Sequence, residues 1–282
     1  MKVTLVFIFS FFFYNCFSQG LSIERVNKIK GATVRINIDN TNAIGTGFFI
    51  NKDGVIASCW HVIEPSIKRN ATGNIISFNK ISVTIDDTSK LEYIIPVEFF
   101  NDTLLYQQAV SNDFVVLFPA QNIMPKYFLK LGDFNALIEG QEVITCGYPI
   151  GIQQKFISKG IVSTKYVDTT LVLKNANYSK KVFRNQALVD ITMNRGNSGG
   201  AVIVLGNSIE DDYVVGIASF IINPIANLAD SFIKQFDSRT GSVVLAGTDP
   251  NEVFSTFTKI LSSTSIGVSG FVSINYLKSI LK

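Results

Sequence analysis

The sequence predicts an all-β protein, built as a barrel or as a sandwich. Of its 282 residues, 47% are hydrophobic and 17% are charged, a composition that supports a packed core. Short apolar runs recur along the chain, and clusters of Gly, Asn, Asp and Ser separate them. Many short strands joined by frequent turns are typical of all-β folds. No internal apolar run reaches the roughly 18 to 20 residues that a membrane-spanning helix needs, so we expect these runs in the core.

The expected strands follow one another along most of the chain. Residues 51–54 (Asn-Lys-Asp-Gly) lie between two apolar runs and are a hairpin signal. Helices are expected at residues 20–30 and 274–282, and the apolar residues of the second segment fall on one helical face. The segments expected as strands are 33–38, 47–50, 54–57, 81–85, 114–118, 142–146, 160–163, 170–173, 187–191, 201–204 and 213–217.

The N-terminus has the pattern of a secretory signal peptide at residues 1–18. A basic residue precedes an apolar stretch at 3–13, and the small residue Ser18 stands where cleavage is expected. A lipid anchor on Cys16 is the competing interpretation, but its neighbours are not the small residues that a lipid-modification site prefers. We therefore expect an exported protein, periplasmic or secreted, with no membrane span once the signal is removed.

The rest of the chain is predicted to divide into two halves. The Pro-containing segment 119–125 is the best linker, which gives an N-terminal domain at 19–120 and a C-terminal domain at 121–282. Residues 223–264 are longer than a plain connection and carry two apolar patches around a Gly/Thr/Asp-rich turn. We interpret this segment as a partly helical insertion in the second domain.

The composition argues against several other classes of protein. The densest basic segment, residues 174–184, is sparser than a nucleic-acid footprint and is expected to be a solvated surface. One His and two isolated cysteines, Cys59 and Cys146, cannot supply a four-ligand zinc site, and no phosphate-binding Gly-rich motif follows a strand. We expect no metal and no cofactor. The cysteines are interpreted as buried free thiols, with a disulfide between them as the alternative.

His61, the one histidine of the chain, follows a strand-like run and stands at a turn. Hydrolysis by an activated serine needs a hydroxyl, a base that takes its proton and a carboxylate that orients the base. Ser198 lies among glycines, and Asp113 stands at the start of an apolar strand. The order His, Asp, Ser is one recurring order for such a triad. Other candidate carboxylates, each in a more polar setting, are Asp86, Asp87 and Asp102.

Five motifs follow one another along the chain: GTGFFINKDGVIASCWHV, NDFVVLF, EGQEVITCGYPIG with KGIVS, DITMNRGNSGGAV, and SIGVSGFVSINYLKSIL. Together they resemble a trypsin-like serine protease of the chymotrypsin fold, and more narrowly the protease domain of the HtrA/Deg family. The resemblance implies two six-stranded Greek-key β-barrels with a short N-terminal helix and a C-terminal helix. It places His61 and Asp113 in the first barrel and the nucleophile Ser198 in the second.

The glycines around Ser198 let the backbone turn sharply and point N–H groups at one place. By resemblance, the amides of Gly196 and Ser198 form the oxyanion hole, with Asn197 in the same loop. Ser198 is then expected to attack a peptide carbonyl, while His61 moves the proton and Asp113 fixes the ring. The activity implied is that of a serine endopeptidase acting on proteins or peptides.

Substrate recognition is predicted in two further segments. The base of the specificity pocket in this fold lies near Thr192, and no acid stands there, so cleavage after Lys or Arg is not expected. The resemblance instead implies small or medium apolar side chains before the cut, in unfolded or exposed segments. The edge strand expected to pair with the substrate backbone contains Ala218, Ser219 and Phe220.

The chain departs from the family pattern before His61 and at its end. Cys59 and Trp60 replace small polar residues, and a Trp there could pack between strands or narrow the site. No PDZ domain is expected after the closing helix, and a homo-oligomer stays open because the family often trimerises. One alternative function is a silent or latent protease-fold protein that binds peptides, with Trp60 or the 223–264 insertion blocking the cleft. A serine esterase with the same triad is another.

Overall fold

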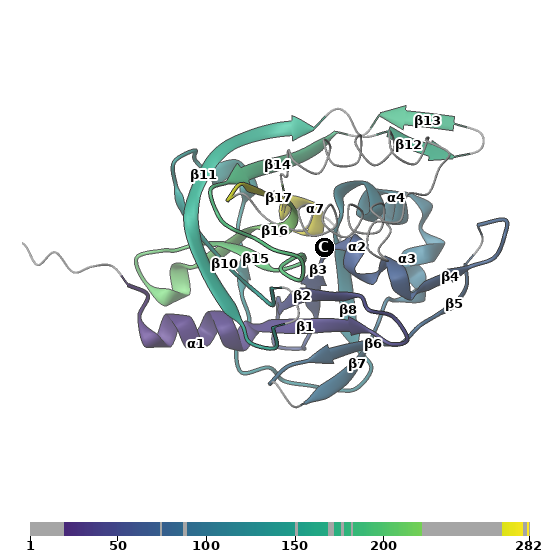
Figure 1. The fold of residues 1–282 in the computed structure, drawn as a ribbon, viewed down its shortest axis with the longest axis horizontal. Helices are drawn as coiled ribbons and strands as arrows, with labels where there is room; N and C mark the ends of the chain where they lie inside the picture. Colours follow the sequence, from purple (N-terminus) through teal and green to yellow (C-terminus); the bar gives the residue numbers. More distant parts are fainter. Residues whose placement is uncertain are drawn as a thin grey trace, which may run out of the picture.

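A computed structural model describes residues 20–73, 75–86, 89–149, 152–168, 172–175, 178–181, 183–221, 267–278 and 281. These residues form two β-barrels that lie side by side (Figure 1). One helix lies near the start of the described chain and another near its end. The predicted all-β class is confirmed, and the architecture is that of barrels, not of a sandwich.

The first barrel is closed by six antiparallel strands in the order β1-β2-β3-β8-β7-β6. In β1, Val34, Ile36 and Ile38 are buried, because successive side chains of a strand point to opposite faces and this set points inward. The predicted hairpin at 51–54 joins β2 to β3. The strands are β1 (Thr33–Ile38), β2 (Ile44–Phe49), β3 (Ile56–Ser58), β6 (Ile81–Thr84), β7 (Lys90–Ile94) and β8 (Val115–Pro119).

The second barrel has the strand order β15-β10-β11-β14-β17-β16, and pairing of β15 with β16 closes it. The short strand β9 adds to β16 in parallel. Phe271 and Val189 are fully buried in its core. The strands are β9 (Lys130–Leu131), β10 (Glu142–Gly147), β11 (Phe156–Asp168), β14 (Arg184–Val189), β15 (Ala201–Val204), β16 (Tyr213–Ile221) and β17 (Ser269–Ser273).

Two hairpins and several helices lie outside the two barrels. The hairpins are β4 (Ile67–Arg69) with β5 (Ile75–Phe78), and β12 (Val172–Asn175) with β13 (Tyr178–Lys181). Both extend away from the barrels on one side of the molecule (Figure 1). The α-helices are α1 (Ile23–Ala32), α2 (Trp60–Ile63), α3 (Val97–Asn101), α4 (Thr103–Asn112) and α7 (Asn275–Lys278), and the 3₁₀ turns are η1 (Glu64–Ser66), η2 (Phe134–Ala136) and η3 (Ile209–Asp211).

The terminal helices were predicted and α3 and α4 were not. The helix expected at 20–30 is α1, which begins after its N-cap Ser22 and runs two residues further. The helix expected at 274–282 is α7, whose described part is shorter. Burial of the unpaired thiols of Cys59 and Cys146 confirms the interpretation of both cysteines.

Several predictions fall on residues outside the described part of the chain. They concern the signal peptide at 1–18, the lipid anchor on Cys16 and the insertion at 223–264. The division into domains at residue 120 stays a prediction. Within the described residues, no helix has both the length and the apolar character needed to cross a membrane.

Candidate active site

His61 and Asp113 come together where α2 and the end of α4 meet. Asp113 is the C-cap of α4 and has φ 52, in the left-handed region that Asp tolerates better than most residues. This conformation directs its carboxylate at α2, where Oδ1 accepts a hydrogen bond from the backbone N–H of His61 at 3.0 Å. The ring Nδ1 of His61 lies 2.8 Å from Oδ2 and 3.0 Å from Oδ1. The predicted base and its orienting carboxylate are therefore in direct contact.

The electrostatics of this pair suit a base. Burial lowers the pKa of His61, but the hydrogen bond and charge of Asp113 outweigh it and raise that pKa above its ordinary value. Burial likewise raises the pKa of Asp113, and its contacts with His61 reverse the shift, so that the net pKa is lowered. An ionised carboxylate only accepts hydrogen bonds, so the facing Nδ1 carries the proton. Nε2 of a neutral His61 is then free to accept a proton.

Behind the pair, Asp113 is held from the second barrel. The hydroxyl of Ser219 donates to its Oδ2, and the buried thiol of Cys59 donates to the carbonyl of Ala218 at 3.1 Å. Burial, followed by the charge of Asp113, raises the pKa of the Cys59 thiol well above its ordinary value, which keeps it protonated. Ser219 was predicted to line the substrate edge, and the structure gives it a role in holding Asp113.

Cys59, His61 and Asp113 form the one cluster of possible metal ligands found among the described residues, with ligand atoms within 4.8 Å of one another. Their atoms are already engaged. Asp113 accepts hydrogen bonds from His61 and Ser219, and Cys59 donates to a backbone carbonyl. This arrangement is that of a hydrogen-bonded His–Asp pair supported by Ser219.

Ser198 lies in the loop between β14 and β15. The backbone of this loop takes conformations that require glycine at two positions. Gly196 and Gly199 have φ values of 96 and 90, where other residues are strained. A Cβ at Gly199 would lie 2.0 Å from the carbonyl oxygen of Thr46. No hydrogen bond joins the amide of Gly196 or Ser198 to a described residue, whereas the amide of Asn197 donates to Asn194 O at 3.0 Å. Two of the three predicted oxyanion-loop residues therefore have N–H groups available to a ligand.

Thr46 was not singled out from the sequence, yet it ties the nucleophile loop to the first barrel. Its hydroxyl donates to Gly196 O at 2.6 Å and accepts from the amide of Tyr148 at 3.1 Å. Its own amide donates to Ser198 O at 2.8 Å, and Ser58 Oγ donates to its carbonyl at 2.7 Å. The signal for this role in the sequence was its position between two glycines of the first motif. In the structure Thr46 is fully buried in β2.

His61 and Ser198 line one cleft of about 440 Å³. It is large enough for part of a peptide, since ligand pockets commonly measure roughly 300–1,000 Å³. The side chain of His61 is 44% exposed towards solvent, while that of Asp113 is 11% exposed. The residues that line the cleft are Asn42, Ala43, Ile44, His61, Val62, Arg195, Gly196 and Ser198.

The remaining predicted residues lie near this centre with different roles. Thr192 is exposed in the loop before the nucleophile. Both backbone groups of Ala218 are already paired, its N–H with Gly200 O and its carbonyl with Gly199 N, each at 2.8 Å. Ala218 is thus held in the barrel by its backbone, and pairing of this edge with a substrate stays a prediction. Phe220 lies in β16, and the structure does not describe its side chain.

The alternative carboxylates are placed elsewhere. Asp102 caps the N-terminus of α4 and accepts from the amides of Leu104 and Leu105. Asp86 lines a separate hollow with Lys30 and Lys155. Asp87 lies outside the described residues. Among the candidates that the structure describes, Asp113 is the carboxylate in contact with His61.

Trp60 does not narrow the cleft. Its side chain is buried and stacks on Phe99 with ring centroids 5.8 Å apart, and the ring of Tyr106 packs against it edge-on at 5.3 Å. The residue thus joins α2 to α3 and α4. Of the two features expected to block the cleft, this one is excluded, and the 223–264 segment lies outside the described residues.

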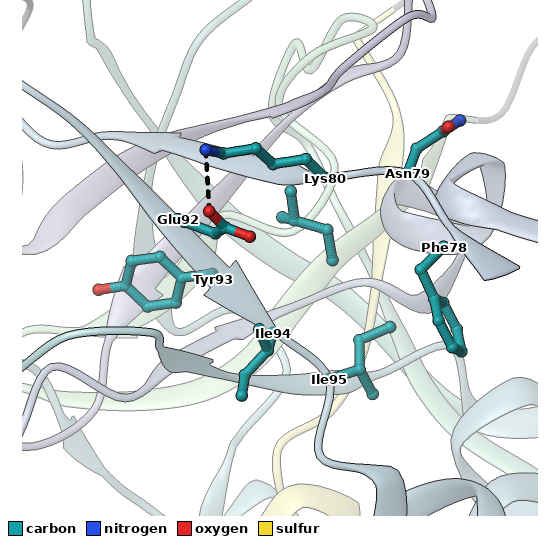
Figure 2. A pocket seen from close by; sticks show the side chains of 8 residues that line it. Phe78, Asn79, Lys80, Glu92, Tyr93, Ile94 and Ile95 are labelled. Carbon is teal, nitrogen blue, oxygen red and sulfur yellow. Dashed lines mark ion pairs between the residues drawn. The ribbon is translucent and has the colours of Figure 1, made fainter.

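A second hollow of about 240 Å³ lies between β6 and β7 on the first barrel (Figure 2). The figure shows the ion pair of Lys80 with Glu92, 2.8 Å apart, beside the apolar side chains of Ile94 and Ile95. Among the described lining residues there is neither His nor Ser, so this hollow lacks the groups for nucleophilic catalysis.

Comparison with known families gives one broad match. The trypsin-like peptidase domain matches residues 45–217, a span that contains His61, Asp113 and Ser198. Among curated relatives, the magnetosome formation protease MamE of Magnetospirillum gryphiswaldense is 29% identical over 185 residues, covering 64% of this chain and 19% of its own length. A probable periplasmic serine endoprotease, DegP-like, of Rickettsia conorii is 26% identical over 209 residues, covering 72% and 34%. The chain therefore spans about a fifth to a third of these relatives.

Solved structures share the fold. The HtrA-type protease AlgW with a tripeptide superposes with a TM-score of 0.56 at 14% identity, covering 92% of this chain and 61% of that one. The Rv3671c protease in its inactive form superposes with a TM-score of 0.55 at 14% identity, covering 92% and 91%. At this identity the likeness concerns the two-barrel architecture, which is chymotrypsin-like.

Proposed function

The chain belongs to the trypsin-like peptidase domain family, and we propose that it is a serine endopeptidase with His61, Asp113 and Ser198 as its catalytic triad. One observation carries the proposal. The ring of His61 is bound to Asp113 on one side and lines the same cleft as Ser198 on the other. A nucleophile, a base and an orienting carboxylate are thus arranged in the order that acyl transfer needs.

The proposed reaction proceeds in two halves. Ser198 Oγ attacks the carbonyl carbon of the scissile peptide bond while His61 Nε2 takes its proton, and the carbonyl oxygen becomes an oxyanion. The amides of Gly196 and Ser198 stabilise that oxyanion, and one such donor typically contributes about 2.7 to 4 kcal/mol. The C–N bond then breaks as His61 gives its proton to the leaving amine. Water, deprotonated by His61, hydrolyses the acyl-enzyme and releases Ser198.

The proposed substrates are exposed or unfolded segments with a small or medium apolar residue before the cut. Thr192 offers no charge for a basic side chain, which supports this preference. The end of β16 beyond Ala218, with Ser219 and Phe220, supplies the edge for backbone pairing. Export is part of the proposal, supported by the pattern at 1–18 and by relatives that are named periplasmic. Assembly into a homo-oligomer stays a prediction.

The test is digestion of a reduced, unfolded protein, with cleavage sites read from the product termini by mass spectrometry. Wild-type protein should cleave it, and Ser198→Ala should lose more than about 1,000-fold in rate. Ser77→Ala, which removes an exposed hydroxyl in β5, is the matched control and should cleave like the wild type. Absence of cleavage by the folded wild type would favour the silent, peptide-binding alternative.

A further inference from the structure

We propose that Arg195 selects substrates with a carboxylate on the leaving side of the scissile bond. The inference rests on the proposed function and adds a specificity that the triad does not determine. It concerns the cleft already described around His61 and Ser198.

Proton transfer fixes which part of a substrate occupies this cleft. The leaving nitrogen receives its proton from His61, so it must lie within hydrogen-bond reach of that ring. Val62 and residues 42–44, where the turn between β1 and β2 runs into β2, line the same cleft as His61. The acyl side of the substrate lies towards β16 in the proposed pairing. In this proposal the residues that follow the cut therefore lie against Val62, residues 42–44 and Arg195.

Among the described residues that line the cleft, the charge that is always present is positive. Arg195 is exposed at the rim, directly before the oxyanion-loop residue Gly196. In the described part of the chain, no acidic side chain lines the cleft, and no ion pair involves Arg195. A guanidinium presents a planar fork that binds a carboxylate through two parallel N–H···O bonds. Ile44, 38% exposed, adds an apolar surface to the same cleft.

A carboxylate in this place has two sources. It belongs either to an Asp or Glu side chain within the first residues after the cut or to the free C-terminus of a short leaving segment. Both present the same group to Arg195, and substrates of defined length separate them.

The experiment measures kcat/KM for quenched fluorescent peptides that share one acyl side, taken from the cleavage sites found above. One arm places Glu, Gln or Lys at the first, second or third position after the cut, in long peptides. The other arm compares a free acid with an amide at the end of a short leaving segment. At one position Glu should exceed Gln by about two- to fivefold, the range of an exposed ion pair. The difference should shrink as salt is added.

Two variants separate Arg195 from the overall charge of the protein. Arg195→Gln should remove the preference for Glu, and Arg195→Glu should turn it into a preference for Lys. Lys52→Glu, in the turn between β2 and β3, makes the same change of charge at a residue outside the described lining of the cleft and should keep the wild-type preference.

Equal kcat/KM for Glu and Gln at every position, and for acid and amide ends, would overturn the inference while leaving the peptidase activity intact. An unchanged preference in Arg195→Gln would overturn it too. If no peptide is cleaved and the unfolded protein also stays intact, the proposed function has failed and the inference fails with it.

Discussion

At the scale of single residues, Asp113 receives hydrogen bonds from both barrels. The backbone and ring of His61 donate from the first barrel, and the hydroxyl of Ser219 donates from the second. Because the carboxylate can only accept, these donors fix its orientation and place the proton of His61 on Nδ1. The position of the carboxylate thus determines which nitrogen of the ring faces the cleft as a base.

The pKa of His61 leads to a prediction for the pH dependence. The neutral ring is the proposed base, so kcat/KM should rise as pH passes through the pKa of His61 in the free enzyme, which Asp113 holds above its ordinary value. Asp113→Asn removes the raising charge, so the midpoint should move to lower pH, and activity should fall by about 10⁴ as in related triads. A pH profile of kcat/KM for both proteins checks this. An unmoved midpoint would contradict the role of Asp113.

Thr46 is expected to matter through the oxyanion loop. Thr46→Val keeps the shape of the side chain but leaves the Gly196 carbonyl and the Tyr148 amide without the hydroxyl. We expect kcat to fall by about 10- to 100-fold, the scale of an ångström-sized misplacement, with KM little changed. Thr46→Ser retains the hydroxyl and should stay within a few-fold of wild type. Steady-state kinetics of the two variants decide the matter, and equal losses would contradict the role of the hydroxyl.

At the scale of elements, α4 carries Asp113 at its C-terminal end and is capped by Asp102 at its start. Asp102→Ala should lower the free energy of unfolding by about 0.5 to 2 kcal/mol, the usual cost of losing an N-cap. Asp102→Asn keeps a capping oxygen and should stay near wild type in both stability and kcat/KM. Urea unfolding and peptide kinetics measure the two quantities. A loss of activity in Asp102→Asn as large as in Asp113→Asn would show that the wrong carboxylate was chosen.

The strands were largely predictable from the sequence because their residues either alternate between apolar and polar or are apolar throughout. The run 33–38 coincides with β1 and 201–204 with β15. The segment before Asp113 was not predicted as helical. Its start signal in the sequence is Asp102, and its packing includes tertiary contacts such as that of Tyr106 with Trp60. Contacts made across distant segments leave no local pattern.

The residues of the candidate site could be predicted where few residues of the required type exist. They could not be predicted where a residue acts through hydrogen bonds to the backbone of a distant segment. A single histidine fixed the base, and the glycines marked Ser198. Thr46 acts through a carbonyl and an amide that only the folded chain brings to it, so its residue type alone gave little warning. The backbone bonds of Ala218 to Gly199 and Gly200 could not be read from the sequence for the same reason.

At the scale of the whole molecule, α1 is tied to the second barrel. Arg25 Nε donates to Asp212 Oδ2 at 2.9 Å, and Lys28 Nζ donates to Ile209 O at 2.6 Å. Asp212 is buried and also accepts from the amide of Gly206. The segment that precedes the first barrel thereby packs on the second and links the two.

Asp212→Ala should therefore lower the free energy of unfolding by about 1 to 3 kcal/mol, because it leaves buried donors without an acceptor. Asn27→Ala alters an exposed residue of the same helix and should change stability by less than about 0.5 kcal/mol. Urea unfolding of both variants checks the comparison. Equal free energies of unfolding for Asp212→Ala and Asn27→Ala would mean that the contacts of α1 with the second barrel do not stabilise the protein.

The two barrels meet at the proposed active site. The first supplies His61, Asp113 and Thr46, and the second supplies Ser198 and Ser219. Labelling with a fluorophosphonate, followed by mapping of the modified residue by mass spectrometry, tests this assembly most directly. We predict modification at Ser198 in the wild type and its loss in His61→Ala. Labelling of Ser198 that persists without His61, or none in folded wild-type protein, would contradict an assembled triad.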